Sequence, residues 1–242
     1  MAPADAVMVP PPASGRVYTH PVIPGLGDVA PDRRARLDAI ARWLQDAAWA
    51  DVVDSGIPDG GVWVVRRMEV LVERFPRFWE PLEVATFCSG TGPLWAERRT
   101  TVRGAEGGLV ETVALWVHLD PDGARPRPLP EGFEAVYGAA AQGRRVRARL
   151  QHPAAPPQDA AATPWTFRAA DLDMARHVNN ATYWAVAEEE LAGRDPGDGF
   201  RATVEHRAPG GAGPARIAAS GPHRWVLDED GAVLATFELP HG

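Results

Sequence analysis

The side chains best suited to chemistry gather in one short stretch, "DLDMARHVNNATYW", which covers residues 171–184. Two Asp, one His and two Asn fall within ten of these positions. Asn is favoured at a helix start, because its side-chain oxygen accepts a free N–H of the first turn. Asn179 and Asn180 precede an apolar helical pattern. One interpretation of the stretch is therefore an ordinary helix cap.

The same residue types are also those that acyl transfer to water requires. Free N–H groups at a helix start can stabilise the oxyanion that forms when a carbonyl is attacked. Asp173, just upstream, could accept a proton from water or attack the carbonyl directly. His177 could orient that carboxylate, bind the carbonyl oxygen or protonate the leaving group. The stretch therefore fits either a cap or a hydrolytic centre.

The first half of the chain predicts one helix followed by a sheet. Apolar residues recur at three- and four-residue spacing over residues 33–54, as on the buried side of a helix. Runs rich in β-branched and aromatic residues then predict strands at 62–72, 82–90, 94–103 and 109–119. Short connections favour antiparallel neighbours, so we expect a meander. The last run is apolar on both faces, which predicts a central strand.

The second half repeats this order of elements. A strand at 165–169 leads into the 171–184 stretch, and a helix is expected at 180–192. The strands that follow are expected at 200–207, 214–220, 223–228 and 232–239, with a hairpin across 228–231 joining the last two. A unit that occurs twice predicts an α+β fold in which a sheet wraps a long helix, twice. Two tandem hotdog units, each a long helix wrapped by an antiparallel sheet, fit this description, and so do other α+β folds until a motif chooses between them.

The amino-acid composition of the segments outside these elements predicts the domain organisation. Residues 1–15 read as a flexible tail, and residues 121–163 are rich in Pro, Ala and Gly, which is typical of a linker. The first hotdog unit is expected at 16–120 and the second at 164–242.

Composition and charge exclude several classes of protein. The 242 residues are 45% hydrophobic with nine Trp, as in a globular protein, and the net charge of −7 argues against general nucleic-acid binding. No run reaches the roughly 18 apolar residues of a membrane span, and the first residues lack the positive start of a signal peptide. The single Cys88 excludes an intrachain disulfide and favours a core position. We expect a cytoplasmic protein.

Two separate motifs resemble one known family, the acyl-acyl-carrier-protein thioesterases of plants and bacteria. "WTFRAADLDMARHVNNATYW" (165–184) resembles the second-repeat motif of that family, D-x-D-x-x-x-H-V-N-N-x-x-Y. "VWVVRRMEVLVERFPRFWEPLEVATFCSGTG" (62–92) is similar to its first-repeat strands, and residues 36–56 resemble its first helix. The resemblance covers about residues 16–239.

The resemblance implies roles for four residues of the motif. Asp173 matches the carboxylate that serves as general base or nucleophile, and His177 matches the catalytic His. Asn179 and Asn180 match the pair that opens the helix.

Two departures from the family pattern weaken these assignments. Ala175 stands where the plant-type motif carries a catalytic Asn, and Pro209-Gly210 stand where it carries an acidic residue and a Cys. Glu189 and Glu205 are candidates to replace the missing acid or to hold the water, although a residue of this kind is more often just a solvated charge.

The resemblance also implies how the substrate is held. The family binds its acyl chain in the first repeat, so Trp63, Met68 and Trp116 are candidate lining residues, or simply core. The carrier protein is acidic, and the densest basic run that could attract it is "GRRVRARL" (143–150), with Arg98-Arg99 second. Both runs could equally be solvated surface.

The predicted function is therefore hydrolysis of a fatty acyl thioester on acyl carrier protein, in fatty acid biosynthesis. It needs no metal or redox cofactor. The alternatives are an acyl-CoA thioesterase, a hotdog dehydratase or hydratase, and a non-catalytic protein that binds acyl carriers. A monomer and a homodimer are both compatible with two repeats in one chain.

Overall fold

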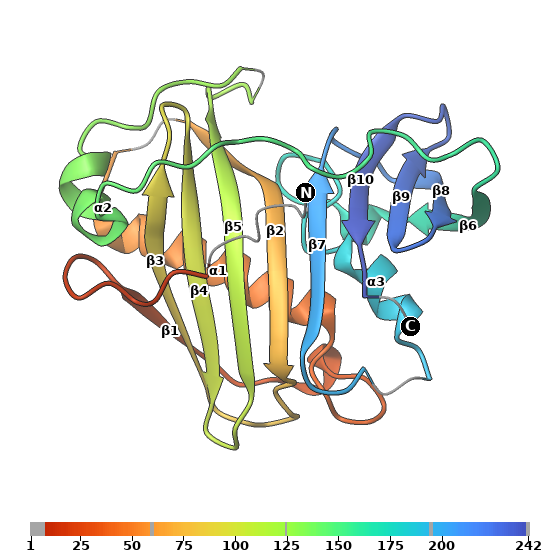
Figure 1. The fold of residues 1–242 in the computed structure, drawn as a ribbon, viewed down its shortest axis with the longest axis horizontal. Helices are drawn as coiled ribbons and strands as arrows, with labels where there is room; N and C mark the ends of the chain where they lie inside the picture. The colour runs from red at the N-terminus through yellow and green to blue at the C-terminus, as the bar shows by residue number, and fades with distance from the viewer. Residues whose placement is uncertain (1–7, 59–60, 124, 194–195, 241–242) are drawn as a thin grey trace.

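One ten-stranded sheet dominates the computed structural model, which describes residues 8–58, 61–123, 125–193 and 196–240 (Figure 1). The strands lie in the order β1-β3-β4-β5-β2-β7-β10-β9-β8-β6. Their bounds are β1 Tyr18–Val22, β2 Val62–Arg74, β3 Leu82–Thr91, β4 Trp95–Gly104, β5 Leu109–Leu119, β6 Ala161–Phe167, β7 Phe200–His206, β8 Gly213–Ser220, β9 His223–Asp228 and β10 Val233–Glu238. The helices are α1 Leu37–Ser55, α2 Phe133–Ala141 and α3 Trp184–Glu190.

The sheet consists of two halves with the same topology. Chain order is β1, α1, β2 to β5 in the first half and β6, α3, β7 to β10 in the second. The halves join where residues 67–72 of β2 pair antiparallel with residues 200–205 of β7. Helices α1 and α3 pack against each other, and both lie behind the sheet in Figure 1. The prediction of an α+β fold of two tandem hotdog units is confirmed.

The predicted meander of the first half is wrong in one pairing. β2 does not pair with β3; it lies between β5 and β7, and β5 is the central strand that its sequence predicts. Residues 75–81 carry the chain across the end of the sheet to β3. The buried carboxylate of Glu80 holds this crossover, because it accepts hydrogen bonds from the N–H groups of Arg77, Glu106 and Gly108.

Helix α1 packs along the first half of the sheet. Its apolar side is buried in a core that continues under α3. It begins at Leu37, four residues later than predicted, because Arg33 takes a left-handed conformation (φ 71°) and the next two residues form antiparallel bridges, Arg34 with Arg77 and Ala35 with Val29. It ends at Gly56, whose left-handed conformation (φ 67°) suits a residue without a side chain.

The face of the sheet opposite the helices is crossed by one extended segment, residues 142–153, here called the strap. It follows α2 and runs in front of the sheet near its upper edge in Figure 1. The N–H of Val146 donates to the carbonyl of Thr91 at 3.0 Å, and that of His152 donates to Glu205 at 3.1 Å. The strap and α2 both lie within the residues predicted as a linker.

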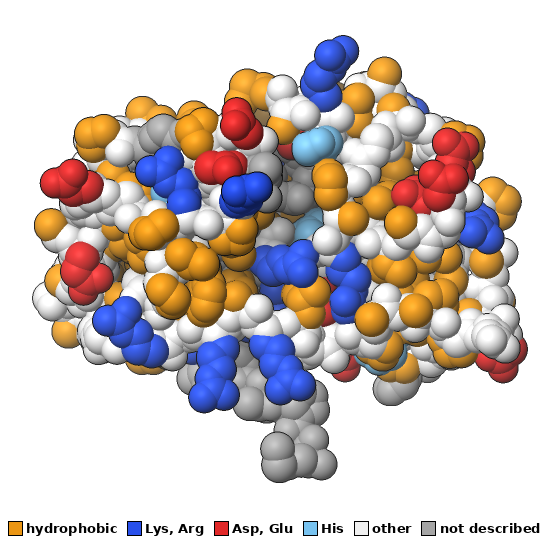
Figure 2. Space-filling model, turned by 90° about the horizontal axis from the view of Figure 1, so that it is seen from above, with side chains coloured by type: hydrophobic (Ala, Val, Ile, Leu, Met, Phe, Trp, Pro, Cys, Tyr) orange, Lys and Arg blue, Asp and Glu red, His pale blue; other side chains and the backbone are white. Residues whose placement is uncertain are grey.

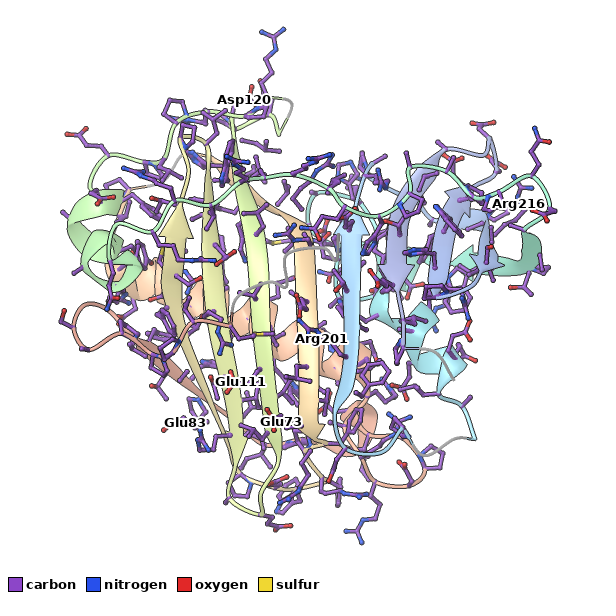
Figure 3. The ribbon with its side chains drawn as sticks, in the orientation of Figure 1. Glu73, Glu83, Glu111, Asp120, Arg201 and Arg216 are labelled. Carbon is purple, nitrogen blue, oxygen red and sulfur yellow. The ribbon has the colours of Figure 1, made fainter. Side chains whose placement is uncertain are left out.

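Beside the strap, the same face carries ion pairs between neighbouring strands. Arg201 of β7 donates to Glu69 of β2 at 2.6 Å, across the join between the halves (Figure 3). Arg99 of β4 and Glu111 of β5 lie 2.8 Å apart. Arg98-Arg99, considered as a basic surface run, is therefore not one: Arg99 is buried in this face, and the Arg98 side chain is only 13% exposed.

Candidate active site

A cavity of about 1290 Å³ lies on the helix side of the first half. It is bounded by the C-terminal half of α1, by α2 and by the β2, β3, β4 and β5 strands. The aromatic rings of Trp63, Trp116 and Phe133 contribute much of its apolar wall. Asp173 and Asn180 reach it from the second half of the chain. The cavity therefore brings together the two motifs that resemble one family.

A tight turn holds Asp173 at the cavity. Its carboxylate oxygen Oδ1 accepts the N–H groups of Ala175 at 2.8 Å and of His177 at 3.4 Å. The backbone closes the same turn, because the N–H of Asp173 donates to the carbonyl of His177 at 2.8 Å. Arg176, inside the turn, takes a left-handed conformation with φ 62°. Asp173 stays exposed, and Oδ2 is left for other contacts.

The neighbouring Asp171 has a structural role. Its carboxylate binds the backbone N–H of Arg168 at 2.7 Å and the guanidinium of the same residue at 2.8 Å. Partial burial opposes ionisation, but these hydrogen bonds outweigh it and lower the pKa of Asp171. Its carbonyl accepts the N–H of Asn179. Asp171 thus shapes the turn that presents Asp173.

The two Asn residues make different contacts, and neither caps α3, whose N-cap residue is Tyr183. Asn179 closes a local turn, since its Oδ1 accepts the N–H of Ala181 at 2.9 Å. Asn180 lines the cavity and, within the described part of the chain, makes no hydrogen bond. Helix α3 itself begins later than predicted, at Trp184, because residues 179–183 form successive tight turns. Donors for an oxyanion would therefore come from these turns and not from α3.

His177 and Glu189 are less closely tied to the cavity. His177 lies on the Asp173 turn and is exposed, but its side chain is not among the residues that line the cavity. Glu189 is exposed on α3. The structure thus brings together Asp173, Asn179 and Asn180, with His177 four residues from the carboxylate.

Glu205 lies on the other side of the sheet. Its neighbour in β7, Val204, packs in the core beneath the helices, so the alternation along the strand turns Glu205 toward the strap. There its carboxylate is fully buried and accepts the N–H groups of Gln151 and His152 and a hydrogen bond from Arg207. The structure does not bring Glu205 to the motif.

With this geometry in view, comparison with known proteins decides the family. The model of the acyl-ACP thioesterase N-terminal domain matches residues 16–137, and that of the C-terminal domain matches residues 154–194. The chain belongs to the acyl-ACP thioesterase family.

Relatives of this thioesterase occur in bacteria and plants. An uncharacterised Mycobacterium tuberculosis protein, Rv2001, is 27% identical over 85% of this chain and 82% of its own length. The chloroplastic palmitoyl-acyl carrier protein thioesterase of Arabidopsis thaliana is 26% identical over 64% of this chain and 42% of its own length. The 12:0-ACP thioesterase of Umbellularia californica has a similar fold, with a TM-score of 0.73 and 24% identity over 93% of this chain and 97% of that chain.

Two of the three candidate acyl-binding residues line the cavity of this thioesterase. Trp63 and Trp116 both contribute to its wall, and the ring of Trp63 lies 5.9 Å from that of Phe133. Met68 is only 4% exposed and is packed in the core, outside the set of lining residues.

Cys88 also lines the cavity but is poorly suited to nucleophilic attack. Its thiol is buried and donates weakly to the carbonyl of Gly90. Burial raises the pKa of Cys88 to about 11, so the thiol stays protonated near neutral pH. No cluster of three metal-binding side chains occurs among the described residues.

The second departure from the family pattern lies directly behind the motif. The carbonyl of Gly210 accepts the N–H of Val178 at 2.8 Å, which places Pro209-Gly210 next to the Asp173 turn. A Cβ atom on Gly210 would lie 2.5 Å from the hydroxyl of Tyr183. A Cys at this position would therefore require Tyr183 to move.

The sequence did not single out Asp51 or Tyr137, and it offered Arg98 only as part of a basic run. Arg98 lines the cavity and forms an ion pair with the buried Asp51, and Tyr137 of α2 lies beside them. The sequence signal for Asp51 was present but weak: it is a charge on the otherwise apolar side of α1. Its partner is 47 residues away, so only the fold could pair them.

Proposed function

We propose that this chain hydrolyses a fatty acyl thioester carried by acyl carrier protein and releases a free fatty acid and the carrier thiol. The observation that carries the proposal is the apolar cavity with Asp173 and Asn180 on its wall. Its volume of about 1290 Å³ is large for a small-molecule site and suits an alkyl chain. Membership of the acyl-ACP thioesterase family favours hydrolysis over the dehydratase and the non-catalytic alternatives.

The polar residues of the turn supply the chemistry. The Asp173 carboxylate takes a proton from water, and the resulting hydroxide attacks the thioester carbon. The side-chain amide and backbone N–H of Asn180 stabilise the oxyanion. The C–S bond then breaks, and the proton passes from Asp173 to the leaving sulfur, with His177 as the relay. Direct attack by Asp173, through an anhydride that water then cleaves, is the other route open to this carboxylate.

The turn geometry explains why Asp173 suits this task. Two backbone N–H groups hold Oδ1 and so fix the orientation of the carboxylate. The carboxylate is exposed at the cavity, so a water molecule can reach it. Ala175, in place of the family Asn, leaves a shorter side chain on this wall.

A thiol-release assay on acyl-acyl-carrier-protein tests the function. The variant Asp173→Ala should lower turnover by a factor on the order of 10²–10⁴, as loss of a general base does. Glu229→Ala, on the exposed β9–β10 turn, is the control and should leave turnover unchanged. Near-normal hydrolysis by Asp173→Ala would remove this carboxylate from the mechanism, and no thiol release by the unaltered protein would refute the function.

The acidic carrier requires a basic surface on this acidic chain, and the strap supplies one. Arg145, Arg147 and Arg149 alternate with partly buried residues along the strap and are exposed. Figure 2, which views the molecule from above, shows basic side chains over the middle and the lower part of the visible face. Preference for the carrier over coenzyme A would follow from contacts with this surface. Equal hydrolysis of both substrates at equal concentration would contradict it.

The described residues contain no helix long and apolar enough to cross a membrane.

The two edge strands of the sheet are β1 and β6. Pairing of either edge with a second copy would make a homodimer, whereas two halves joined in one sheet are sufficient for a monomer.

A further inference from the structure

A cluster of charged side chains meets the wall of the apolar cavity at Arg98. Asp51 of α1 has no exposed surface and binds two guanidinium groups. Arg98 of β4 lies 2.6 Å from one carboxylate oxygen, and Arg16 lies 2.6 Å from the other. The Arg98 guanidinium also donates to the Thr86 hydroxyl at 3.2 Å and lies 5.8 Å from the centre of the Tyr137 ring. These contacts hold Arg98 in one place.

Arg98 still has unused hydrogen-bond donors. Both of its hydrogen bonds leave from Nη1, and no described residue accepts one from Nε or Nη2. Arg98 lines the cavity together with Trp116, Phe133 and other largely apolar residues. An alkyl chain that reached this point would have to displace water from those donors. Leaving buried donors without acceptors weakens binding, and more so when the donors belong to a charged group.

The strand order gives the depth at which Arg98 lies. The motif lies over β7, since Val178 binds the carbonyl of Gly210 just after that strand. β2 and β5 separate β7 from β4, which carries Arg98. Three strand spacings of about 4.8 Å place Arg98 about 14 Å from the reacting end. That is the reach of an extended acyl chain of medium length.

We propose that Arg98, held by Asp51, sets the upper limit of acyl chain length in this cavity. This inference rests on the proposed function, because it concerns the same cavity. A chain that stops before Arg98 leaves the guanidinium hydrated. A longer saturated chain buries it against methylene groups and binds less well.

The variant Arg98→Met tests the limit, because it replaces the guanidinium by an apolar side chain of similar reach. Asp51 keeps its ion pair with Arg16, so the cluster is not left as a lone buried charge. With saturated acyl carriers from octanoyl to stearoyl, the ratio of kcat/KM for long over medium chains should rise about tenfold or more. Arg98→Lys, which keeps a charge at this position, should largely preserve the original ratio.

The matched control is Arg103→Met. Arg103 lies on the same strand but is exposed on the opposite face, so the same change of charge should leave the ratio unaltered. An unchanged ratio in Arg98→Met, or an equal change in Arg103→Met, would overturn the proposal. If circular dichroism shows that Arg98→Met does not fold, Arg98→Leu, which also removes every donor, carries the same test.

Binding of free saturated fatty acids separates this inference from the hydrolytic function. Titration calorimetry with decanoic to stearic acid reports the length limit without any chemistry. A shift toward longer acids in Arg98→Met, with no thiol release by any form of the protein, would refute the hydrolase and retain the limit. Thiol release by the unaltered protein, together with an unshifted binding profile in Arg98→Met, would retain the hydrolase and refute the length limit.

Discussion

The two halves of the sheet have the same strand order but carry different helices. The first half packs the 19-residue α1 against five strands, and the second packs the seven-residue α3 against five. The long helix forms one wall of the cavity. In the second half, the residues just before the short helix form the turn that presents Asp173 and Asn180. On the proposed function, one topology supplies substrate binding in one copy and chemistry in the other.

Buried and exposed carboxylates also differ in their partners, in both halves of the chain. Asp51 and Glu205 are fully buried and are held by guanidinium or backbone N–H donors from distant parts of the chain. Asp173 is exposed, and its hydrogen bonds come from its own turn. Buried carboxylates with several partners hold the structure together, whereas an exposed one with a free oxygen is available to water.

The largest expected effect that tests this contrast is the loss of stability on replacing Glu205. Glu205→Ala removes the acceptor of two strap N–H groups and of Arg207, and so leaves buried donors unpaired. The free energy of unfolding should fall by about 3–5 kcal/mol, measured by urea denaturation. Turnover per folded molecule should stay close to normal.

Glu83→Ala is the control for this change. Glu83 is exposed on β3 and lies in the lower part of the sheet in Figure 3, away from the strap. Its loss should alter the unfolding free energy by less than about 0.5 kcal/mol. If Glu205→Ala instead abolished thiol release while the stability stayed unchanged, Glu205 would belong to the chemistry and the contrast would fail.

An effect of intermediate size is expected for the two buried histidines, His152 and His206. Burial, with a contribution from Arg66, lowers the pKa of His206 to about 4, and burial also lowers that of His152 to about 4. Between about pH 6.5 and 4 the unfolded chain therefore binds protons that the folded chain does not. Stability should fall as the pH falls through this window, by about 1.4 kcal/mol per pH unit for each histidine, and level off below it.

His206→Gln isolates one of these two groups. Its unfolding free energy, measured by urea denaturation from pH 7 to 4, should depend on pH less steeply than that of the unaltered protein by about one proton. An identical pH dependence would mean that His206 is protonated in the folded state as easily as in the unfolded chain.

The smallest effect is expected at the strap surface. Replacing Arg147 and Arg149 by Glu should raise KM for the acyl carrier substrate by about three- to tenfold at low salt, because charges at an interface mainly affect encounter. The effect should vanish at high salt, since exposed charges are screened. Hydrolysis of an acyl-pantetheine, which lacks the carrier, should not change.

Arg216→Glu serves as the comparison for the strap variant. Arg216 is exposed on β8, near the far edge of the second half in Figure 3. It should leave KM for the carrier substrate unaltered. An equal rise in KM for both variants would show that overall charge, and not the strap, attracts the carrier.

The secondary structure could largely be predicted, because its signals are local. The period of apolar residues located α1 and the strands to within a few residues. Two of the exceptions arose where a distant partner competed. Ala35 pairs with the crossover before β3 in place of the first turn of α1, and β2 pairs with β5 and β7 in place of β3.

The site could be predicted only in part, for the same reason. Asp173 and Asn180 lie in one turn formed by adjacent residues, so their nearness was visible in the chain. Alternation along a strand shows that Glu205 and Val204 face opposite ways, but not which of them faces the helices. For the same reason, the sequence could not show that Arg98 and Arg99 are both largely buried, on opposite faces of β4.

The sequence by itself determined the type of fold, the repeat and the turn that presents Asp173, since each depends on residues close together in the chain. The tertiary structure alone decided which face each strand turns to the helices and which charges meet. Asp51 and Arg98 come together at the cavity only because α1 packs over β4 in one register. A pairing of residues 47 positions apart is a property of packing, and no local pattern records it.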